Sequence, residues 1–325
     1  MDDSVLETIG SPLVRVSGPD GGTVAAKLES RNPGGSAKDR PASAMVAAAE
    51  DAGELEPGDE LVEPSSGNTG VGIAVAAAAK GYDATIVMPA SKSPERRRLL
   101  RAYGATVELV DGDITAARER ADELVAQGMV QLSQFDNPAN PGAHYETTGP
   151  EILDQLDGRT PDALVCGVGT GGTITGVGRR LRETFPDVDV VAVEPEANAV
   201  LSGDDPGEDA FQGMGPGFVS PNLDTDLLDG VLRVDLADAE TECRRLAREE
   251  GILVGQSSGA SNLAARRVAR AFVDGEPPGY RPVAVDGWEP RPDAGTAGPD
   301  PLVLTVYWDS GERYMSTGLF DANDG

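Results

Sequence analysis

Lysine is rare in this chain, and one of its four lysines lies where a reactive amine would be useful. Lys38 follows the turn Asn-Pro-Gly-Gly at 32–35 and precedes an alanine-rich segment, 39–53, that the sequence predicts as a helix. The positive end of a helix dipole disfavours a protonated amine, so this is a poor place for a structural cation. It suits a neutral amine that forms a Schiff base with an aldehyde, with a surface lysine near a helix start as the alternative interpretation.

A second polar loop, Ser-Ser-Gly-Asn-Thr-Gly at 65–70, follows a predicted strand and begins a predicted helix. Its polar side chains belong to Ser65, Ser66, Asn68 and Thr69. Together with the backbone N–H groups of the helix start, they concentrate hydrogen-bond donors in a small space, which suits a carboxylate. A well-capped helix would explain one of these residues but not the whole run.

A glycine-rich loop, "CGVGTGGTITG" at 166–176, follows another predicted strand and begins a helix. Backbone N–H groups in such a loop are placed to bind a phosphate. Gly167, Gly169 and Gly172 also fit the spacing G-x-G-x-x-G, and Glu194 closes the next strand, as in dinucleotide-binding proteins. Taken alone, this loop would indicate a nicotinamide-dependent dehydrogenase, but that interpretation explains neither Lys38 nor the polar loop.

The three loops together supply an amine for an aldehyde, donors for a phosphate and donors for an amino-acid carboxylate, which are the requirements of pyridoxal phosphate chemistry. The sequence resembles the cysteine synthases (O-acetylserine sulfhydrylases) and their cystathionine β-synthase relatives, of fold type II. The motifs that carry the resemblance occur in order along the chain: "IGSPLVRV" at 9–16, "NPGGSAKDR" at 32–40, "EPSSGNTG" at 63–70, "QFDNPANPGAHYETTGPEI" at 134–152, "GVGTGGTITGVGR" at 167–179, "AVEP" at 192–195, "EEGILVGQSSGA" at 249–260 and "DSGERYMSTGLF" at 309–320.

The resemblance implies a role for each matching residue. Lys38 carries the internal aldimine and acts as general base once a substrate amine displaces it. Asn68 lies beside the 3′-oxygen of the cofactor, and Ser257 hydrogen-bonds its pyridine nitrogen. Five consecutive residues hold the cofactor phosphate: Gly169, Thr170, Gly171, Gly172 and Thr173. Five residues bind the substrate, chiefly through its carboxylate: Ser65, Ser66, Asn68, Thr69 and Gln134.

The activity implied is a β-replacement on an activated L-serine, with sulfide as nucleophile and L-cysteine as product. A serine at the pyridine nitrogen, in place of a carboxylate, makes the ring a weaker electron sink and favours β-elimination over transamination. Cystathionine synthesis from serine and homocysteine is the nearest alternative, and a non-catalytic scaffold of this fold is another. The leaving group stays open among acetyl, phosphate and hydroxyl. Lys92 replaces a methionine that is usual in relatives, and its charge would favour a substrate with a phosphate leaving group unless the side chain points into solvent. Gln256 and Trp308 also depart from the family pattern.

The chain is strongly acidic, with 55 Asp and Glu against 27 Lys and Arg and a formal net charge of −28. This charge argues against a nucleic-acid partner. Acid excess with few lysines resembles proteins of salt-accumulating archaea, with an ordinary acidic mesophilic protein as the alternative. The longest apolar run, 71–79, is too short to cross a bilayer, and no signal peptide is recognisable, so we expect a cytoplasmic protein with no membrane partner. Cys166 and Cys243 have no metal-ligand spacing, so we expect no metal; His144 has a capping or packing role.

Predicted strands and helices alternate along most of the chain, which indicates an α/β fold with mostly parallel sheets flanked by helices. We expect two domains: a smaller mobile one at 36–141, and a larger one, 1–35 plus 142–325, that carries the phosphate loop. The segment 274–300, rich in Pro, Gly and Asp, is predicted as an acidic surface excursion rather than a lid. The resemblance also implies a homodimer and leaves open whether a serine acetyltransferase tail binds at the site.

Overall fold

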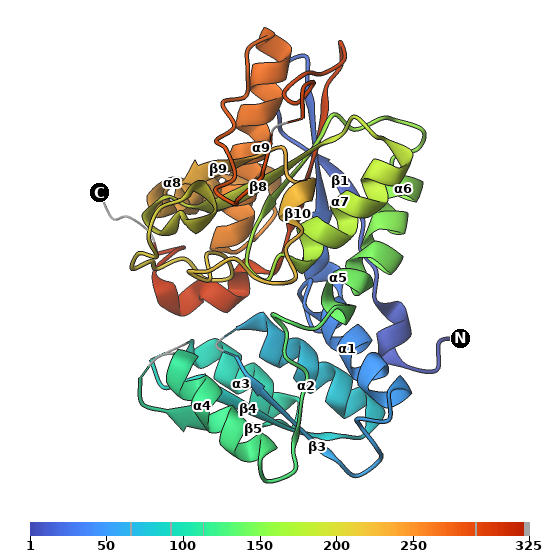
Figure 1. Cartoon of the computed structure of the whole chain (residues 1–325), viewed down its shortest axis with the longest axis vertical. Helices are drawn as coiled ribbons and strands as arrows, with labels where there is room; N and C mark the ends of the chain where they lie inside the picture. Colours follow the sequence, from blue (N-terminus) through green and yellow to red (C-terminus); the bar gives the residue numbers. More distant parts are fainter. Residues whose placement is uncertain (66, 92, 113, 290, 322–325) are drawn as a thin grey trace. The chain divides into compact units, whose positions relative to one another are not determined.

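The computed structural model describes residues 1–65, 67–91, 93–112, 114–289 and 291–321 (Figure 1). Two residues with expected roles, Ser66 and Lys92, lie outside the described residues. The chain divides into two compact units. Unit 1 comprises Met1–Ile9, Ser30–Asn140 and Arg313–Gly325, and unit 2 comprises Gly10–Glu29 and Pro141–Glu312.

Unit 1 is built on a four-stranded parallel sheet with the strand order β5-β4-β3-β6 (Figure 1). Its strands are β3 (Glu60–Pro64), β4 (Asp83–Pro89), β5 (Thr106–Val110) and β6 (Val130–Gln131). Its helices include α1 (Asp39–Asp51), α2 (Asn68–Lys80), α3 (Pro94–Ala102) and α4 (Ile114–Val125), with single 3₁₀ turns at η1 (Val5–Thr8) and η2 (Glu29–Arg31).

Successive side chains of a strand point to opposite faces of its sheet, and the core of unit 1 follows this rule. Leu61 of β3 packs with residues of α1 and α2, whereas the next residue, Val62, packs with residues of α4. Ile86 and Val87 of β4 divide in the same way. Helices therefore cover both faces of the sheet, which is why apolar residues lie next to each other in β3 and β4.

Unit 2 is built on a six-stranded sheet with the order β1-β2-β10-β7-β8-β9. Its strands are β1 (Leu13–Val16), β2 (Thr23–Leu28), β7 (Ala163–Gly167), β8 (Asp189–Pro195), β9 (Gly230–Val234) and β10 (Leu302–Tyr307). Only the β1–β2 pair is antiparallel among the strand pairs of the described residues. Its helices include α6 (Gly149–Gln155), α7 (Gly172–Thr184), α8 (Leu236–Arg245) and α9 (Gln256–Asp274), and α5 (Ala139–Ala143) begins at the boundary of the units. The prediction of mostly parallel sheets flanked by helices is confirmed.

The two units are assembled from more segments than the sequence pattern suggests. We assigned residues 1–35 and everything after 141 to the larger domain, yet 1–9 and the segment that begins at Arg313 belong to unit 1. The reason is packing: Leu6 contacts the unit 1 core, and Arg313 hydrogen-bonds to Asn68. Neither contact is visible in local sequence periodicity.

The predicted surface excursion, 274–300, runs between α9 and β10 and is held more closely than a solvated loop. Val283 is buried in the core of unit 2, and Trp288 donates from Nε1 to the Leu228 carbonyl at 2.9 Å. Arg291 donates from Nε to Asp229 at 3.0 Å. The excursion is therefore a tethered part of unit 2. Across the described residues, none of the helices combines the length and the apolar character that a membrane crossing requires.

Candidate active site

Lys38 is the residue that immediately precedes α1, as the sequence predicts, and its side chain is half-buried. Its carbonyl accepts the first helical hydrogen bond, from Ala42 at 3.0 Å, and its N–H donates to Ser36 Oγ at 3.2 Å. The preceding turn closes through the Gly35 N–H, which donates to the Asn32 carbonyl at 2.8 Å with Gly35 at φ +79°. The backbone on both sides of Lys38 is thus fixed by local bonds.

Helix α2 packs directly onto the Lys38 backbone through a glycine. A Cβ atom at Gly72 would lie 2.6 Å from the Lys38 carbonyl oxygen and 3.1 Å from the Cβ of Ala42. Real Cβ atoms do not approach backbone this closely, so any larger residue at 72 would displace Lys38 or α2. Gly72 therefore sets the distance between the lysine and the helix that begins at the polar loop.

Arg313 joins the Lys38 turn to the polar loop. It is 6% exposed and donates from Nη1 to Asn68 Oδ1 at 2.6 Å and from Nη2 to the Gly34 carbonyl. The Gly34 N–H in turn donates to Asp39 Oδ2 at 2.6 Å. The sequence interpretation missed Arg313, although it lies in the quoted motif "DSGERYMSTGLF"; its place in that motif was the available sequence signal.

The polar loop divides its hydroxyl groups between local capping and the site. Ser65 Oγ accepts from the N–H groups of Gly67 at 3.3 Å and Gly70 at 3.1 Å, so this hydroxyl holds the start of α2. Its expected contact with substrate stays a prediction, and Ser66 lies outside the described residues. Asn68 is the first residue of α2. The backbone N–H groups of a helix's first turn have no partner within the helix, so they can donate to a ligand.

Thr69 and Gln134 are far apart in sequence but in direct contact. Thr69 Oγ1 donates to Gln134 Oε1 at 2.5 Å, and both residues are less than a tenth exposed. A neighbouring carboxyl, Glu63, accepts from the Gln134 N–H at 3.2 Å and from the Ser133 N–H at 3.1 Å. Burial raises the pKa of Glu63 to about 7, although these backbone donors act in the opposite direction. Sequence reasoning named Thr69 and Gln134 and missed Glu63.

In unit 2, the predicted phosphate loop connects the end of β7 to the start of α7. Gly171 has φ +78°, and a Cβ there would lie 2.6 Å from the Cβ and 2.8 Å from the Cα of Leu223, so only glycine fits. A Cβ at Gly169 would lie 2.9 Å from the Gly213 carbonyl oxygen. The Gly172 N–H donates to Thr170 Oγ1 at 3.4 Å. The loop is therefore largely glycine backbone at the N-terminus of a helix, where backbone N–H groups commonly bind a phosphate.

His144 supports this loop from the side. Its ring is 1% exposed, with Nε2 3.0 Å from Thr173 Oγ1 and Nδ1 2.9 Å from Thr148 Oγ1. The close packing of α7 against the segment that carries His144 also requires Gly176, since a Cβ there would lie 2.3 Å from the Pro141 carbonyl oxygen. The packing role expected for His144 is thus specific: it orients the hydroxyl of a predicted phosphate ligand.

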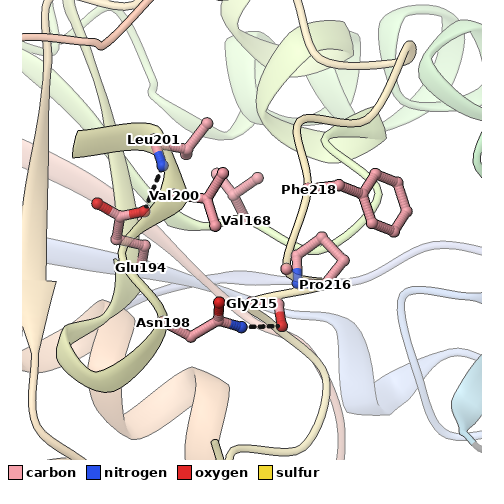
Figure 2. A pocket seen from close by; sticks show the side chains of 9 residues that line it. Val168, Glu194, Asn198, Val200, Leu201, Gly215, Pro216 and Phe218 are labelled. Atoms are coloured by element: carbon pink, nitrogen blue, oxygen red, sulfur yellow. Dashed lines mark hydrogen bonds between the residues drawn. The ribbon is translucent and has the colours of Figure 1, made fainter. Parts of the chain in front are cut away.

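A second segment braces the loop through the backbone. The Gly215 N–H donates to the Val168 carbonyl at 2.9 Å, and the Gly215 carbonyl accepts from Asn198 Nδ2 at 2.9 Å. Figure 2 shows the small cavity beside these contacts, with Pro216 and Phe218 on one side and Glu194 on the other. The cavity is too small for a cofactor. Asn198 holds Gly215, and Gly215 in turn holds the backbone of Val168, directly before the phosphate loop.

Ser257 lies in the first turn of α9 and is 3% exposed. A Cβ at Gly213 would lie 3.4 Å from Ser257 Oγ, so Gly213 borders both this serine and Gly169 of the phosphate loop. Within the part of the chain that the structure describes, the Ser257 hydroxyl makes no hydrogen bond. The neighbouring Gln256, which departs from the family pattern, accepts from the Gln212 N–H at 3.0 Å and so holds the segment that leads to Gly213.

These residues fit pyridoxal phosphate. Unit 2 places a phosphate-type loop and the hydroxyl of a buried serine on either side of Gly213, which matches a phosphate and a ring nitrogen carried by one small molecule. Unit 1 gathers five predicted residues around the start of its helices: Lys38, Ser65, Asn68, Thr69 and Gln134.

Comparison with known proteins agrees with this chemistry. The family model described as pyridoxal-phosphate dependent enzyme matches residues 6–284. A cysteine synthase of Staphylococcus aureus is 44% identical over 329 residues, covering 99% of this chain and 98% of that protein. The crystal structure of O-ureido-L-serine synthase has a TM-score of 0.88 at 41% identity and covers 100% of this chain and 96% of that one. The crystal structure of cysteine synthase from Entamoeba histolytica has a TM-score of 0.88 at 32% identity, with coverages of 100% and 92%. The chain therefore belongs to the pyridoxal-phosphate-dependent enzymes, within the family of the cysteine synthases.

Proposed function

We propose that this protein forms L-cysteine by replacing the β-substituent of an activated L-serine with sulfide. The observation that carries the proposal is the packing inside unit 1: Gly72 holds the backbone of Lys38 against the helix whose first turn supplies Asn68 and Thr69. A reactive amine and donors for an amino-acid carboxylate are thereby built on one rigid pair of helices. The dehydrogenase interpretation of the glycine loop is set aside, because the family match accounts for the same glycines.

When bound, pyridoxal phosphate acts as an electron sink that makes the Cα proton of an amino acid acidic and allows a β-substituent to leave. In this proposal Lys38 binds the cofactor covalently and, once displaced by the substrate amine, takes the Cα proton on Nζ. Residues 169–173 hold the phosphate with their backbone N–H groups. Ser257 offers a neutral hydroxyl to the ring nitrogen, and Asn68, oriented by Arg313, is placed for the 3′-oxygen.

Substrate recognition is assigned to the polar loop and Gln134. Thr69 Oγ1 donates to Gln134 Oε1, so the amide nitrogen is the donor of that side chain. It has two N–H groups: one accounts for the side-chain hydrogen bond with Glu63, and the other is assigned to the substrate carboxylate. Ser65, Ser66 and Asn68 complete the proposed set. An O-acetylserine-dependent cystathionine beta-synthase from Helicobacter pylori is 31% identical to this chain, so homocysteine in place of sulfide is the second candidate.

A substrate panel tests this function. Purified protein with pyridoxal phosphate is expected to be yellow and to form cysteine from O-acetyl-L-serine or O-phospho-L-serine with sulfide, at least about tenfold faster than it forms cystathionine with homocysteine. Product analysis by mass spectrometry checks each pair, with L-serine included as a poor leaving-group control. Faster formation of cystathionine would establish the second candidate, and a colourless protein that binds a nicotinamide nucleotide would overturn both.

We further propose that the protein is a cytoplasmic homodimer and that it is adapted to high salt. The net charge of −28 supports the adaptation to high salt. Salt at molar concentration shortens the Debye length to about 3 Å and screens self-repulsion in the compact state. The melting temperature is therefore expected to rise by about 10 °C or more between 0.05 and 2 M KCl, at roughly 2–4 °C per kcal/mol for a chain of this size. Scanning calorimetry of the holoenzyme measures it. Equal melting temperatures at both concentrations would contradict the adaptation.

A further inference from the structure

Glu63 is a buried carboxyl that the proposed chemistry does not use. It lies near the end of β3, in the strand that leads into the polar loop, and is 1% exposed. Its Oε1 accepts from the Gln134 N–H at 3.2 Å and its Oε2 from the Ser133 N–H at 3.1 Å. Both oxygens therefore hold the backbone of one short segment that lies seventy residues further along the chain.

That segment has an unusual backbone. Ser133 has φ +56°, in the left-handed region that residues other than glycine seldom adopt. A conformation of this kind persists only when surrounding contacts impose it. The two bonds from Glu63 are such contacts, and they act at the residue that sets the direction in which Gln134 leaves the strand.

Gln134 is then fixed at three points. Its N–H is bound by Glu63, its carbonyl accepts from Asn140 Nδ2 at 2.8 Å, and its side-chain Oε1 accepts from Thr69 at 2.5 Å. Glu63 is the only charged group among these partners. Loss of its carboxylate would remove the bond to the Gln134 N–H and weaken the side-chain hydrogen bond that Gln134 makes with Glu63.

A carboxyl at this position is costly for folding. Burial disfavours the ionised form and raises the pKa of Glu63 to about 7. A neutral residue of similar shape would avoid that cost, because neighbouring β3 residues such as Leu61 and Val62 pack as ordinary core. The carboxyl therefore serves something other than the stability of the sheet.

We propose that Glu63 is a positioning residue that holds Gln134 in place to bind the substrate carboxylate, and so sets the preference for a free amino acid over its amide. The proposal rests on the proposed function, in which Thr69 and Gln134 bind that carboxylate. Glu63 itself does not touch substrate; it acts through the backbone of residues 133 and 134 and through its hydrogen bond with the Gln134 side chain.

The test compares L-serine with L-serinamide, which differ only in the carboxylate. Binding of each to the holoenzyme is followed by the change in visible absorption of the bound cofactor. Wild type is expected to prefer L-serine, and Glu63→Gln to reduce that preference about tenfold while its affinity for L-serinamide stays within about twofold. Gln134→Ala should reduce the preference similarly, and the double variant should lose little more, because both changes act on one contact.

Glu194→Gln is the matched control. Glu194 is also a buried carboxyl, 3% exposed, that accepts from two successive backbone N–H groups, Leu201 at 2.8 Å and Ser202 at 3.0 Å, but it lies in unit 2 (Figure 2). It is expected to keep the wild-type preference. If Glu63→Gln does not fold, Glu63→Asp decides, since it keeps the charge and withdraws the oxygens by one bond: a lowered preference supports the proposal and a wild-type preference overturns it.

The outcomes separate the two levels of inference. Full preference for L-serine in Glu63→Gln, or an equal loss of affinity for both ligands, overturns the positioning role and leaves the carboxylate site intact. A wild-type enzyme that binds both ligands equally, or a Gln134→Ala variant with unchanged preference, overturns the carboxylate assignment together with the proposal built on it. A holoenzyme that responds to neither ligand overturns the proposed function itself.

Discussion

Lys38→Ala is expected to purify with little visible absorption and to form cysteine at least roughly 10²–10⁴-fold more slowly than wild type. The variant lacks both the amine that binds the cofactor covalently and the base for the Cα proton, and loss of the base alone accounts for that range. Absorption spectra after dialysis and initial rates with O-acetyl-L-serine and sulfide measure the two effects. Folding should be retained, since the bonds that fix residue 38 come from its backbone.

Lys80→Ala is the matched control for this prediction. Lys80 ends α2 in the same unit and pairs with Glu50 at 2.5 Å, with its side chain 28% exposed. Its removal costs at most about 1 kcal/mol of stability and should leave the colour and the rate unchanged. Borohydride treatment of the wild-type holoenzyme followed by peptide mapping should place the cofactor on Lys38. A cofactor found on another lysine, or an active and yellow Lys38→Ala, would refute the assignment.

The second large effect is expected from Gly72→Ala. At an exposed position inside a helix, replacing glycine with alanine stabilises a protein by up to about 1 kcal/mol. Here the new methyl group would lie 2.6 Å from the Lys38 carbonyl oxygen, so backbone must move. Overpacking of this kind costs about 1–3 kcal/mol and outweighs the gain in helix propensity. Because a displacement of about 1 Å at a catalytic group can lower the rate about 10²-fold, we expect a large fall in kcat as well.

Denaturant unfolding and kcat measurements on the holoenzyme check both parts. Gly142→Ala provides the comparison, since Gly142 lies in α5 and a Cβ there meets nothing within 4 Å. It should be neutral or slightly stabilising, with wild-type kcat. If Gly72→Ala is as stable and as active as Gly142→Ala, then Gly72 does not hold Lys38 in place.

Sequence patterns located the loops of this site because each loop depends on local chemistry. Lys38 before α1, Asn68 at the start of α2 and Gly171 before α7 all lie at helix starts that the flanking residues specify. The alternation of strands and helices likewise predicted parallel sheets. Glycines required by backbone geometry, such as Gly171 at φ +78°, are visible in sequence as part of a motif.

Contacts between distant segments could not be predicted in this way. Arg313 meets Asn68 across 245 positions of sequence, and Glu63 meets Gln134 across 71. Periodicity reports which face of an element is buried, not which partner covers it. For the same reason the pattern did not show that Leu6 packs against the core of unit 1, and it predicted a solvated excursion where Trp288 is anchored.

The contact of Arg313 with Asn68 and Gly34 also bears on the order of events during translation. A ribosome produces the main segment of unit 1, 30–140, before the main segment of unit 2, 141–312, and only afterwards the arginine that joins the two loops of unit 1. Domains that are made first usually fold first, because a ribosome adds only about 5–20 residues per second. The link between Gly34 and Asn68 must instead wait for Arg313, which is made at least about 9 s after Asn140. The local bonds around Lys38 need only residues made much earlier, so a nascent chain can order the lysine turn first and link it to the polar loop later.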